Sequence, residues 1–183
     1  MTADEVLDLS KFTILIVDDY SFVSQIIAAT LKEMGIGRVL TSENGAQAKE
    51  QIQALNNFEN GSNIDVVIMD WLMPVMDGRA LLQWIRQSNK ETIKFLPVVV
   101  CSAYTSGSLV SETRDLGANE VIVKPVSAAE LAKRIQRTIN SPRPFVKSKS
   151  FFGPDRRRQN RAFDHEDRRK AKPQDLKAHY EQK

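Results

Sequence analysis

Several residues able to handle a phosphoryl group follow short apolar runs in this 183-residue chain: Asp18 and Asp19 follow FTILIV, Asp70 follows DVVIM, Ser102 follows PVVVC, and Lys124 follows EVIV. If these runs are neighbouring parallel strands, their carboxyl ends lie along one edge of a sheet, which is where open α/β folds bind ligands. Three carboxylates gathered there repel one another strongly unless a divalent cation lies between them. The residue types therefore predict a metal site beside a hydroxyl and an amine.

The elements that must position these residues alternate along the chain. Apolar runs predict strands, and helical spacing of apolar residues predicts helices between them. The strands are expected at 12–17, 38–41, 65–69, 97–101 and 120–123, and the helices near 21–34, 44–56, 78–88, 107–115 and 127–139. Five βα units in succession predict an α/β fold, with one parallel sheet covered by helices on both faces.

Two of these helices have clear sequence signals. The first has apolar residues at helical spacing that predict one buried face: Val23, Ile26, Ile27, Thr30, Leu31 and Met34. Gly35 can end it in a left-handed conformation. The last begins with the capping-box spacing SAAE at 127–130. The segment 107–115 has few residues to pack, which is compatible with a movable element or with an ordinary surface helix.

The composition changes near residue 140. Residues 1–140 carry 13 Lys and Arg against 17 Asp and Glu, whereas residues 141–183 carry 13 against 6. We therefore divide the chain into a lead at 1–10, a folded domain at 11–140 and a basic, arginine-rich tail at 141–183. The tail is polar and interrupted by proline, so it is expected to be mostly disordered. Its charge indicates an anionic partner or a contact with the acidic domain.

The chain shows no targeting segment. The start MTADEVLDLSK lacks the regions of a signal peptide, and no apolar stretch approaches the ~18 residues of a membrane span. We therefore expect no membrane span and a cytoplasmic location. Cys101 is the only cysteine, which excludes a disulfide within the chain and favours a small buried apolar residue over a reactive thiol.

Four motifs resemble those of the receiver domains of two-component response regulators: VDDY at 17–20, MDWLMPVMDG at 69–78, SA at 102–103 and KP at 124–125. The resemblance covers roughly residues 11–140 and is to a chemotaxis-type, single-domain receiver with an arginine-rich tail. It implies a flavodoxin-like (βα)5 sheet with strand order 2-1-3-4-5. It also implies a cis peptide bond at Lys124-Pro125.

The resemblance implies that Asp70 is the phosphoacceptor in a phosphorelay. Asp70 would take the phosphoryl group as a mixed anhydride, with Lys124 pairing with one phosphoryl oxygen and Ser102 donating a hydrogen bond to another. Both histidines, His165 and His179, lie in the tail. The donor is therefore expected to be external, a phosphohistidine on a sensor histidine kinase or on a histidine phosphotransfer protein.

The implied cofactor is Mg²⁺. Asp19 and Asp70 would ligate it directly, the backbone carbonyl of Leu72 and waters would complete the octahedron, and Asp18 would hold a coordinated water. Magnesium suits such a site because it prefers hard oxygen ligands and retains exchangeable waters. The receiver itself would catalyse its phosphorylation and dephosphorylation, without being a conventional enzyme.

The sequence departs from the family at the position three residues before the lysine, where receivers usually carry a switching Tyr or Phe. Here the residue is Val121, so the change at Ser102 would have to travel by other packing changes. Tyr104 is compatible with that role and equally with a loop tyrosine that has no part in switching. Leu72 and Tyr104 also stand at the two positions that flank the approach of hydrolytic water in this family. Bulky side chains there are expected to exclude water and lengthen the life of the phosphoryl group.

The tail leaves three interpretations open. The stretch RRQNR at 157–161 resembles the RRxxR element with which PilZ domains contact cyclic di-GMP, and arginine can bind phosphates and stack on bases. The candidate anion-binding residues are Arg156, Arg157, Arg158 and Arg161. The alternatives are nucleic acid binding and a solvated or protein-docking arm that reaches a downstream target.

Two other functions are compatible with parts of the pattern. The chain could be an adaptor in which the tail is the main effector and phosphorylation is secondary. A haloacid-dehalogenase-type phosphatase also uses an Asp nucleophile after a strand, but it normally needs a second Asp two residues later, where this chain has Leu72.

Overall fold

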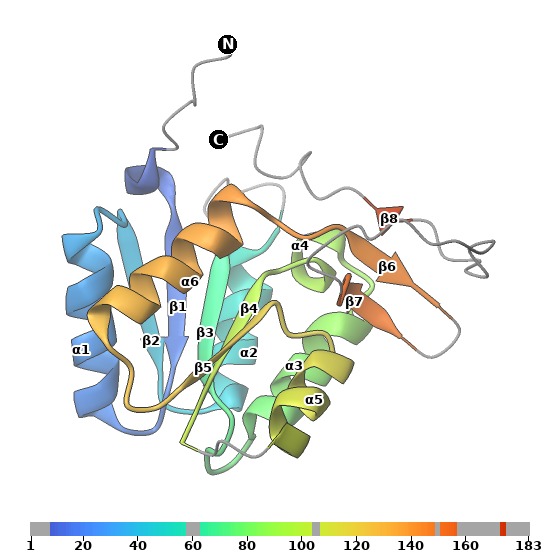
Figure 1. Ribbon diagram of the computed structural model, residues 1–183, viewed down its shortest axis with the longest axis horizontal. Helices are drawn as coiled ribbons and strands as arrows, with labels where there is room; N and C mark the ends of the chain where they lie inside the picture. The colour runs from blue at the N-terminus through green and yellow to red at the C-terminus, as the bar shows by residue number, and fades with distance from the viewer. Residues whose placement is uncertain (1–7, 58–62, 104–106, 149–150, 157–172, 175–183) are drawn as a thin grey trace.

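The computed structural model describes residues 8–57, 63–103, 107–148, 151–156 and 173–174. Its centre is a five-stranded parallel sheet with the order β2-β1-β3-β4-β5 (Figure 1). The strands are β1 (Thr13–Val17), β2 (Arg38–Ser42), β3 (Val66–Asp70), β4 (Val98–Ser102) and β5 (Glu120–Val123). The order predicted from the family resemblance is therefore confirmed.

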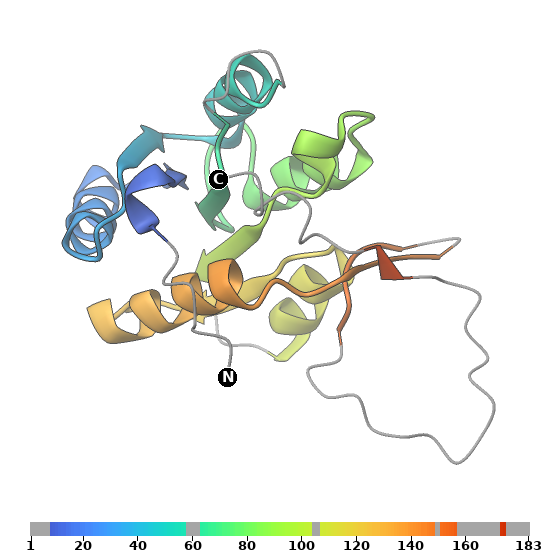
Figure 2. The ribbon, with the colours of Figure 1, turned by 90° about the horizontal axis from the view of Figure 1, so that it is seen from above.

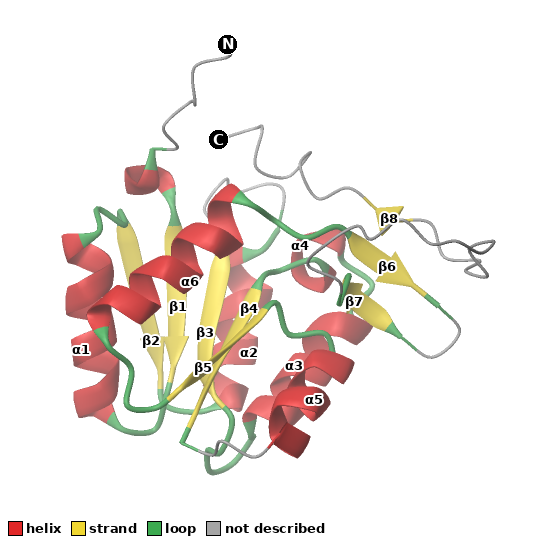
Figure 3. Cartoon of the chain, in the orientation of Figure 1, coloured by secondary structure: helices red, strands yellow, loops and turns green. Residues whose placement is uncertain are grey.

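Helices connect the strands and cover both faces of the sheet, as Figures 2 and 3 show. They are α1 (Ser21–Glu33), α2 (Gly45–Leu55), α3 (Gly78–Gln87), α4 (Glu91–Lys94), α5 (Gly107–Asp115) and α6 (Ala128–Asn140), and a 3-10 turn, η1 (Leu9–Lys11), precedes β1. Because side chains alternate along a strand, Ile14 and Ile16 pack with α1 and α6, while Leu15 and Val17 pack with α2 and α3. The core therefore has two apolar layers, one on each face.

The predicted elements agree closely with the observed ones, and each bound differs by at most one residue. The short helix α4 was not predicted, because one turn of ETIK gives no helical period to detect. Among the described residues, no helix has both the length and the apolar character needed to cross a bilayer.

The helix-end signals act as expected. The hydroxyl of Ser127 accepts a hydrogen bond from the N–H of Glu130 at 3.2 Å, and Gly35 has a φ of +89° after α1. The predicted buried face of α1 was wrong at Ile26, whose exposure is 48%. Ile26 lies one turn after Phe22 on the outer face of the helix, whereas Ile27, which was also predicted to be buried, is buried.

Part of the tail, which was expected to be mostly disordered, is ordered. Strand β6 (Phe145–Lys147) pairs antiparallel with β7 (Phe152–Pro154), and the two-residue strand β8 (Pro173–Gln174) pairs with the other side of β6. Phe145 is fully buried, and its ring lies 5.1 Å from that of Phe95 and 5.3 Å from that of Phe152. Folded structure therefore continues past residue 140, because these aromatic residues bury apolar surface. The average composition of the tail is polar and did not indicate this.

Arg86 of α3 connects this ordered segment to the domain. Its side chain is buried, and its guanidinium lies 5.0 Å from the centre of the Phe145 ring. It donates hydrogen bonds to four oxygen atoms, those of Gly117 (2.9 Å), Lys94 (3.0 Å), Leu96 (2.8 Å) and the Asn119 side chain (3.0 Å). Buried charge is tolerated when it is hydrogen-bonded in this way, so Arg86 fixes the loops on which Phe145 packs.

Candidate functional site

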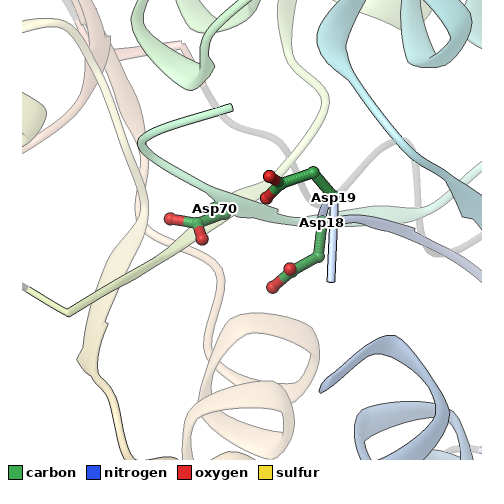
Figure 4. Close-up of side chains that lie close together, drawn as sticks. All are labelled: Asp18, Asp19 and Asp70. Carbon is green, nitrogen blue, oxygen red and sulfur yellow. The ribbon is translucent and has the colours of Figure 1, made fainter. Parts of the chain in front are cut away.

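Three aspartates meet at the carboxyl edge of the sheet. Asp18 and Asp19 directly follow β1, Asp70 ends β3, and the pairing of Val17 with Met69 brings the two strand ends side by side. Each side chain offers an oxygen within 4.8 Å of those of the other two (Figure 4). Asp18 is buried, Asp70 is partly buried and Asp19 is exposed. The cluster therefore opens to solvent through Asp19, and the predicted convergence of carboxylates is confirmed.

Lys124 lies between two of these carboxylates. Its Nζ donates to Asp18 Oδ2 at 2.7 Å and to Asp70 Oδ2 at 2.6 Å, and its side chain is only 17% exposed. Burial alone would lower the pKa of Lys124, but the hydrogen bonds and charges of the two carboxylates outweigh it and raise the pKa. The ammonium group is therefore charged at neutral pH and next to the Asp70 carboxylate.

Ser102 belongs to the same edge. It is the last residue of β4, it is buried, and its backbone carbonyl accepts a hydrogen bond from the N–H of Lys124 at 2.8 Å. Because Asp70 pairs with Cys101, Ser102 lies one residue beyond the level of Asp70. The hydroxyl-bearing residue thus stands beside both the lysine and the candidate phosphoacceptor.

The loops after β1 and β3 hold the carboxylates in place. The N–H of Tyr20 donates to Asp18 Oδ1 at 2.9 Å, and the N–H of Leu72 donates to Asp70 Oδ1 at 3.2 Å. Gly78 begins α3 close to the strand, and a Cβ at this position would collide with the backbone carbonyl of Asp70. Glycine is therefore required there by the close approach of α3 to the site.

The remaining predicted residues have different outcomes. The cis peptide bond at Lys124-Pro125 is confirmed. Val121 is partly buried on β5 beside Val100, and its role in switching stays a prediction, as does the role of the Leu72 carbonyl. Tyr104 and three tail arginines lie outside the described residues: Arg157, Arg158 and Arg161. Arg156 is described, and it forms an ion pair with Asp115 at 2.9 Å rather than with the aspartates of the cluster.

An exposed apolar rim next to the aspartates was not predicted from the sequence. Tyr20 is 68% exposed and Phe22 71%, just after Asp19, while Leu72 (53%) and Val75 (86%) follow Asp70. Val75 also has a φ of +68°, which is unfavourable for a β-branched residue. The rim could have been predicted from the apolar residues of DDYSF and DWLMPV, because they follow the strands and are not part of the apolar runs that form the core.

Cys101 lies under this edge and is buried, as predicted. Burial raises the pKa of its thiol to about 12, although the nearby charge of Lys124 acts in the opposite direction. We expect the native protein at pH 8 to react with a thiol reagent at least about a thousandfold more slowly than the urea-unfolded chain, because both access and thiolate fraction fall. Absorbance-monitored labelling would measure both rates, and equal rates would contradict the buried thiol.

The arrangement combines a carboxylate able to act as a nucleophile, a cation 2.6 Å from it, and two further acidic side chains. Asp70 keeps access to solvent, since 14% of its side chain is exposed. Carboxylates can form covalent intermediates by nucleophilic attack, and neighbouring cations stabilise the charge that develops. The site is therefore chemically suited to accept an electrophilic group on Asp70.

Comparisons with known proteins agree with this geometry. The family model described as "Response regulator receiver domain" matches residues 14–136. The chemotaxis protein CheY of Bacillus subtilis is 35% identical over 127 residues, which cover 69% of this chain and 97% of that protein. The structure of CheY4 from Vibrio cholerae is 30% identical with a TM-score of 0.60, covering 69% of this chain and 97% of that one.

A further solved structure contains a related protein with a metal. It is the CheX-CheY-BeF3-Mg+2 complex from Borrelia burgdorferi, whose matching chain is 29% identical with a TM-score of 0.61, over 69% of this chain and 88% of that one. The family match covers most of the chain, and the curated relative is matched over nearly its whole length. The chain therefore belongs to the response regulator receiver domain family.

Proposed function

We propose that this protein is a response regulator that accepts a phosphoryl group on Asp70 from a phosphohistidine and signals through protein contacts. The observation that carries the proposal is the position of Lys124 Nζ, 2.6 Å from Asp70 and 2.7 Å from Asp18. A fixed cation at the nucleophile stabilises the negative charge that passes to the phosphoryl oxygens during transfer.

The transfer is a displacement at phosphorus. An oxygen of the Asp70 carboxylate attacks the phosphorus, the P–N bond to the donor imidazole breaks, and the imidazole leaves with the electron pair of that bond. The product on this chain is an acyl phosphate, a mixed anhydride. Lys124 then pairs with a phosphoryl oxygen, and the Ser102 hydroxyl donates a hydrogen bond to another.

The acidic cluster fits a magnesium ion. Its three carboxylates lie within 4.8 Å of one another, and Lys124 supplies one positive charge against three negative ones, so a divalent cation would complete the neutralisation. Asp19 and Asp70 would hold it directly, the Leu72 carbonyl would be a further ligand, and Asp18 would hold one of its waters. When bound, the metal would supply positive charge to the phosphoryl oxygens.

The apolar rim supports a protein as the phosphoryl donor. Tyr20 and Phe22 at the start of α1, and Leu72 and Val75 in the loop after β3, place exposed apolar side chains close in sequence to the aspartates of the site. Binding of a small phosphate compound does not require exposed apolar side chains, whereas a group of them near a site is typical of protein interfaces. The partner we propose is a sensor histidine kinase or a histidine phosphotransfer protein, and a protein target would receive the signal.

A phosphorylation assay tests the proposal. With Mg²⁺ and acetyl phosphate, the intact mass of the protein should increase by one phosphoryl group, and the adduct should be stable in acid and labile in base. Removal of the divalent cation with EDTA should reduce the adduct at least about tenfold, because the clustered carboxylates would then repel the incoming phosphate. No adduct with either acetyl phosphate or a phosphorylated kinase would refute the proposal.

A second candidate function uses the basic tail. The excess of Lys and Arg over Asp and Glu in residues 141–183 favours an anionic ligand, either cyclic di-GMP or nucleic acid, with phosphorylation as a secondary input. The two ligands differ in their response to salt. Nucleic acid binding weakens steeply with ionic strength through counterion release, whereas a dinucleotide held by paired arginines and stacking is less sensitive.

A further inference from the structure

The ordered part of the tail, which we call the strap (residues 141–148 and 151–156), contacts the C-terminal end of α5. Arg156 Nη1 lies 2.9 Å from Asp115 Oδ1, and Arg114 Nη2 donates to the backbone carbonyl of Arg156 at 3.3 Å. Gly117 packs so closely on β7 that a Cβ there would lie 2.9 Å from the carbonyl of Phe152. The last described residue before the basic segment 157–172 is thus held by the helix that follows β4.

The strap has a firm part and a weak part. Phe145 is fully buried against Phe95, so the beginning of the strap is fixed to the domain. The Arg156–Asp115 pair, in contrast, is about half exposed, with side-chain exposures of 45% and 59%. Exposed ion pairs contribute little net stability, so this contact can break while the firm part stays in place.

The packing around the weak part leaves room for movement. A cavity of about 310 Å³ lies between α3, the end of α5 and the strap, and Asp115, Leu116 and Phe151 are among its lining residues. Arg156 is further held by the ring of Phe151, 4.4 Å from the guanidinium carbon. An end of α5 that borders a cavity can shift without disturbing the close-packed core.

Helix α5 connects this contact to the phosphoacceptor edge. It begins at Gly107, five residues after Ser102, and ends at Asp115 beside the strap (Figures 1 and 3). Of its nine residues, all of them described, only Thr113 is fully buried. A short helix with so little buried surface can move as a unit, so a displacement at the Ser102 end is transmitted to Asp115.

We propose that α5 links the two sites, so that phosphorylation of Asp70 releases Arg156, and with it the start of the basic tail, from Asp115. This inference rests on the proposed function. The phosphoryl oxygens draw Ser102 and Lys124 away from their present contacts, and the strand end that leads into α5 moves with Ser102. Release then frees the charge of Arg156, which directly precedes the arginine-rich stretch of the sequence, to bind an anionic partner.

Coupling of this kind is reciprocal. If phosphorylation weakens the Arg156–Asp115 contact, then breaking that contact must favour the phosphorylated state by the same factor. Asp115→Asn removes the ion pair at an exposed position outside the phosphoacceptor site. We therefore expect this variant to exchange the amide hydrogen of Asp155, next to Arg156, faster and to reach a higher level of phosphorylation.

The test uses hydrogen exchange on the full-length chain. The amide of Asp155 donates to the carbonyl of Pro144 at 2.8 Å and reports on the end of the strap. Its exchange should accelerate about two- to fivefold when Mg²⁺ and acetyl phosphate are added, and by a similar factor in unphosphorylated Asp115→Asn. The intact mass of each sample measures the phosphorylated fraction in parallel.

Glu130→Gln is the matched control. It also removes one carboxylate from a partly exposed ion pair, with Arg134 at 2.7 Å, but on α6. This control should exchange like the wild type. A phosphoryl adduct without faster exchange at Asp155, or an Asp115→Asn variant that behaves like Glu130→Gln, would overturn the inference alone, while absence of any adduct would overturn the proposed function as well.

Discussion

Asp70→Asn should abolish formation of the acid-stable, base-labile phosphoryl adduct, with a loss of at least about a hundredfold in the labelling rate. The amide has no anionic oxygen to attack phosphorus, and its nitrogen is not nucleophilic. The change also removes the partner of Lys124 at 2.6 Å, although Lys124 keeps Asp18 at 2.7 Å. Intact mass after incubation with Mg²⁺ and acetyl phosphate measures the effect.

Asp77→Asn provides the matched control in the same loop. Asp77 caps α3, where its Oδ1 accepts the N–H of Ala80 at 2.8 Å, and asparagine is an equally good capping residue. The control should fold normally and label at nearly the wild-type rate. Labelling of Asp70→Asn at the rate of Asp77→Asn would show that the phosphoryl group goes to another residue.

The fold and the acidic cluster were predictable because both depend on local patterns. Uninterrupted apolar runs such as ILIV and VVVC are typical of strands covered on both faces, and the chemical residue follows each run directly. Parallel strands place Asp18, Asp70 and Lys124 at one edge of the sheet, and the strand order that brings them close came from the family resemblance. In the structure, Lys124 reaches across β4 to contact Asp70 at 2.6 Å and Asp18 at 2.7 Å.

Other features could not be predicted because they depend on contacts between distant segments. Helical spacing indicates an apolar stripe, but it cannot tell how wide the contact with the sheet is, and Ile26 therefore fell outside it. The exposure of Tyr20 and Leu72 was not predicted, because both residues lie within the family motifs VDDY and MDWLMPVMDG and were interpreted as part of them. The strap was not predicted because its three phenylalanines lie in a segment whose average composition is polar. Nothing in the sequence shows that one of them, Phe145, packs against Arg86 and Phe95.

The burial of Phe145 changes how the tail should be separated from the domain. A chain cut after residue 140, the boundary suggested by composition, loses the ring that packs between Phe95, Phe152 and Arg86. Weaker ligand binding by such a truncated protein would then report damage to the domain rather than loss of a binding arm. Experiments on the basic segment should therefore keep the strap and change residues beyond Arg156.

Phe145→Ala should lower the free energy of unfolding by about 3–5 kcal/mol, the usual cost of removing a fully buried phenylalanine ring. The side chain has no exposed surface, and it makes two ring contacts at 5.1 and 5.3 Å and a cation–π contact at 5.0 Å. Its loss would leave a cavity beside the buried charge of Arg86, where entry of water weakens the hydrogen bonds to the loops before β4 and β5. Urea unfolding followed by tryptophan fluorescence measures the change.

Phe151→Ala is the control, because it removes the same ring from the same strap at a partly exposed position. Its ring stacks on Arg156 at 4.4 Å, so we expect a loss of about 1 kcal/mol or less. Similar unfolding midpoints for the two variants would mean that Phe145 is not part of the core. A large difference, with Phe145→Ala far less stable, would show that this receiver domain extends into the strap and that the end of α5 is packed against an integral part of the fold.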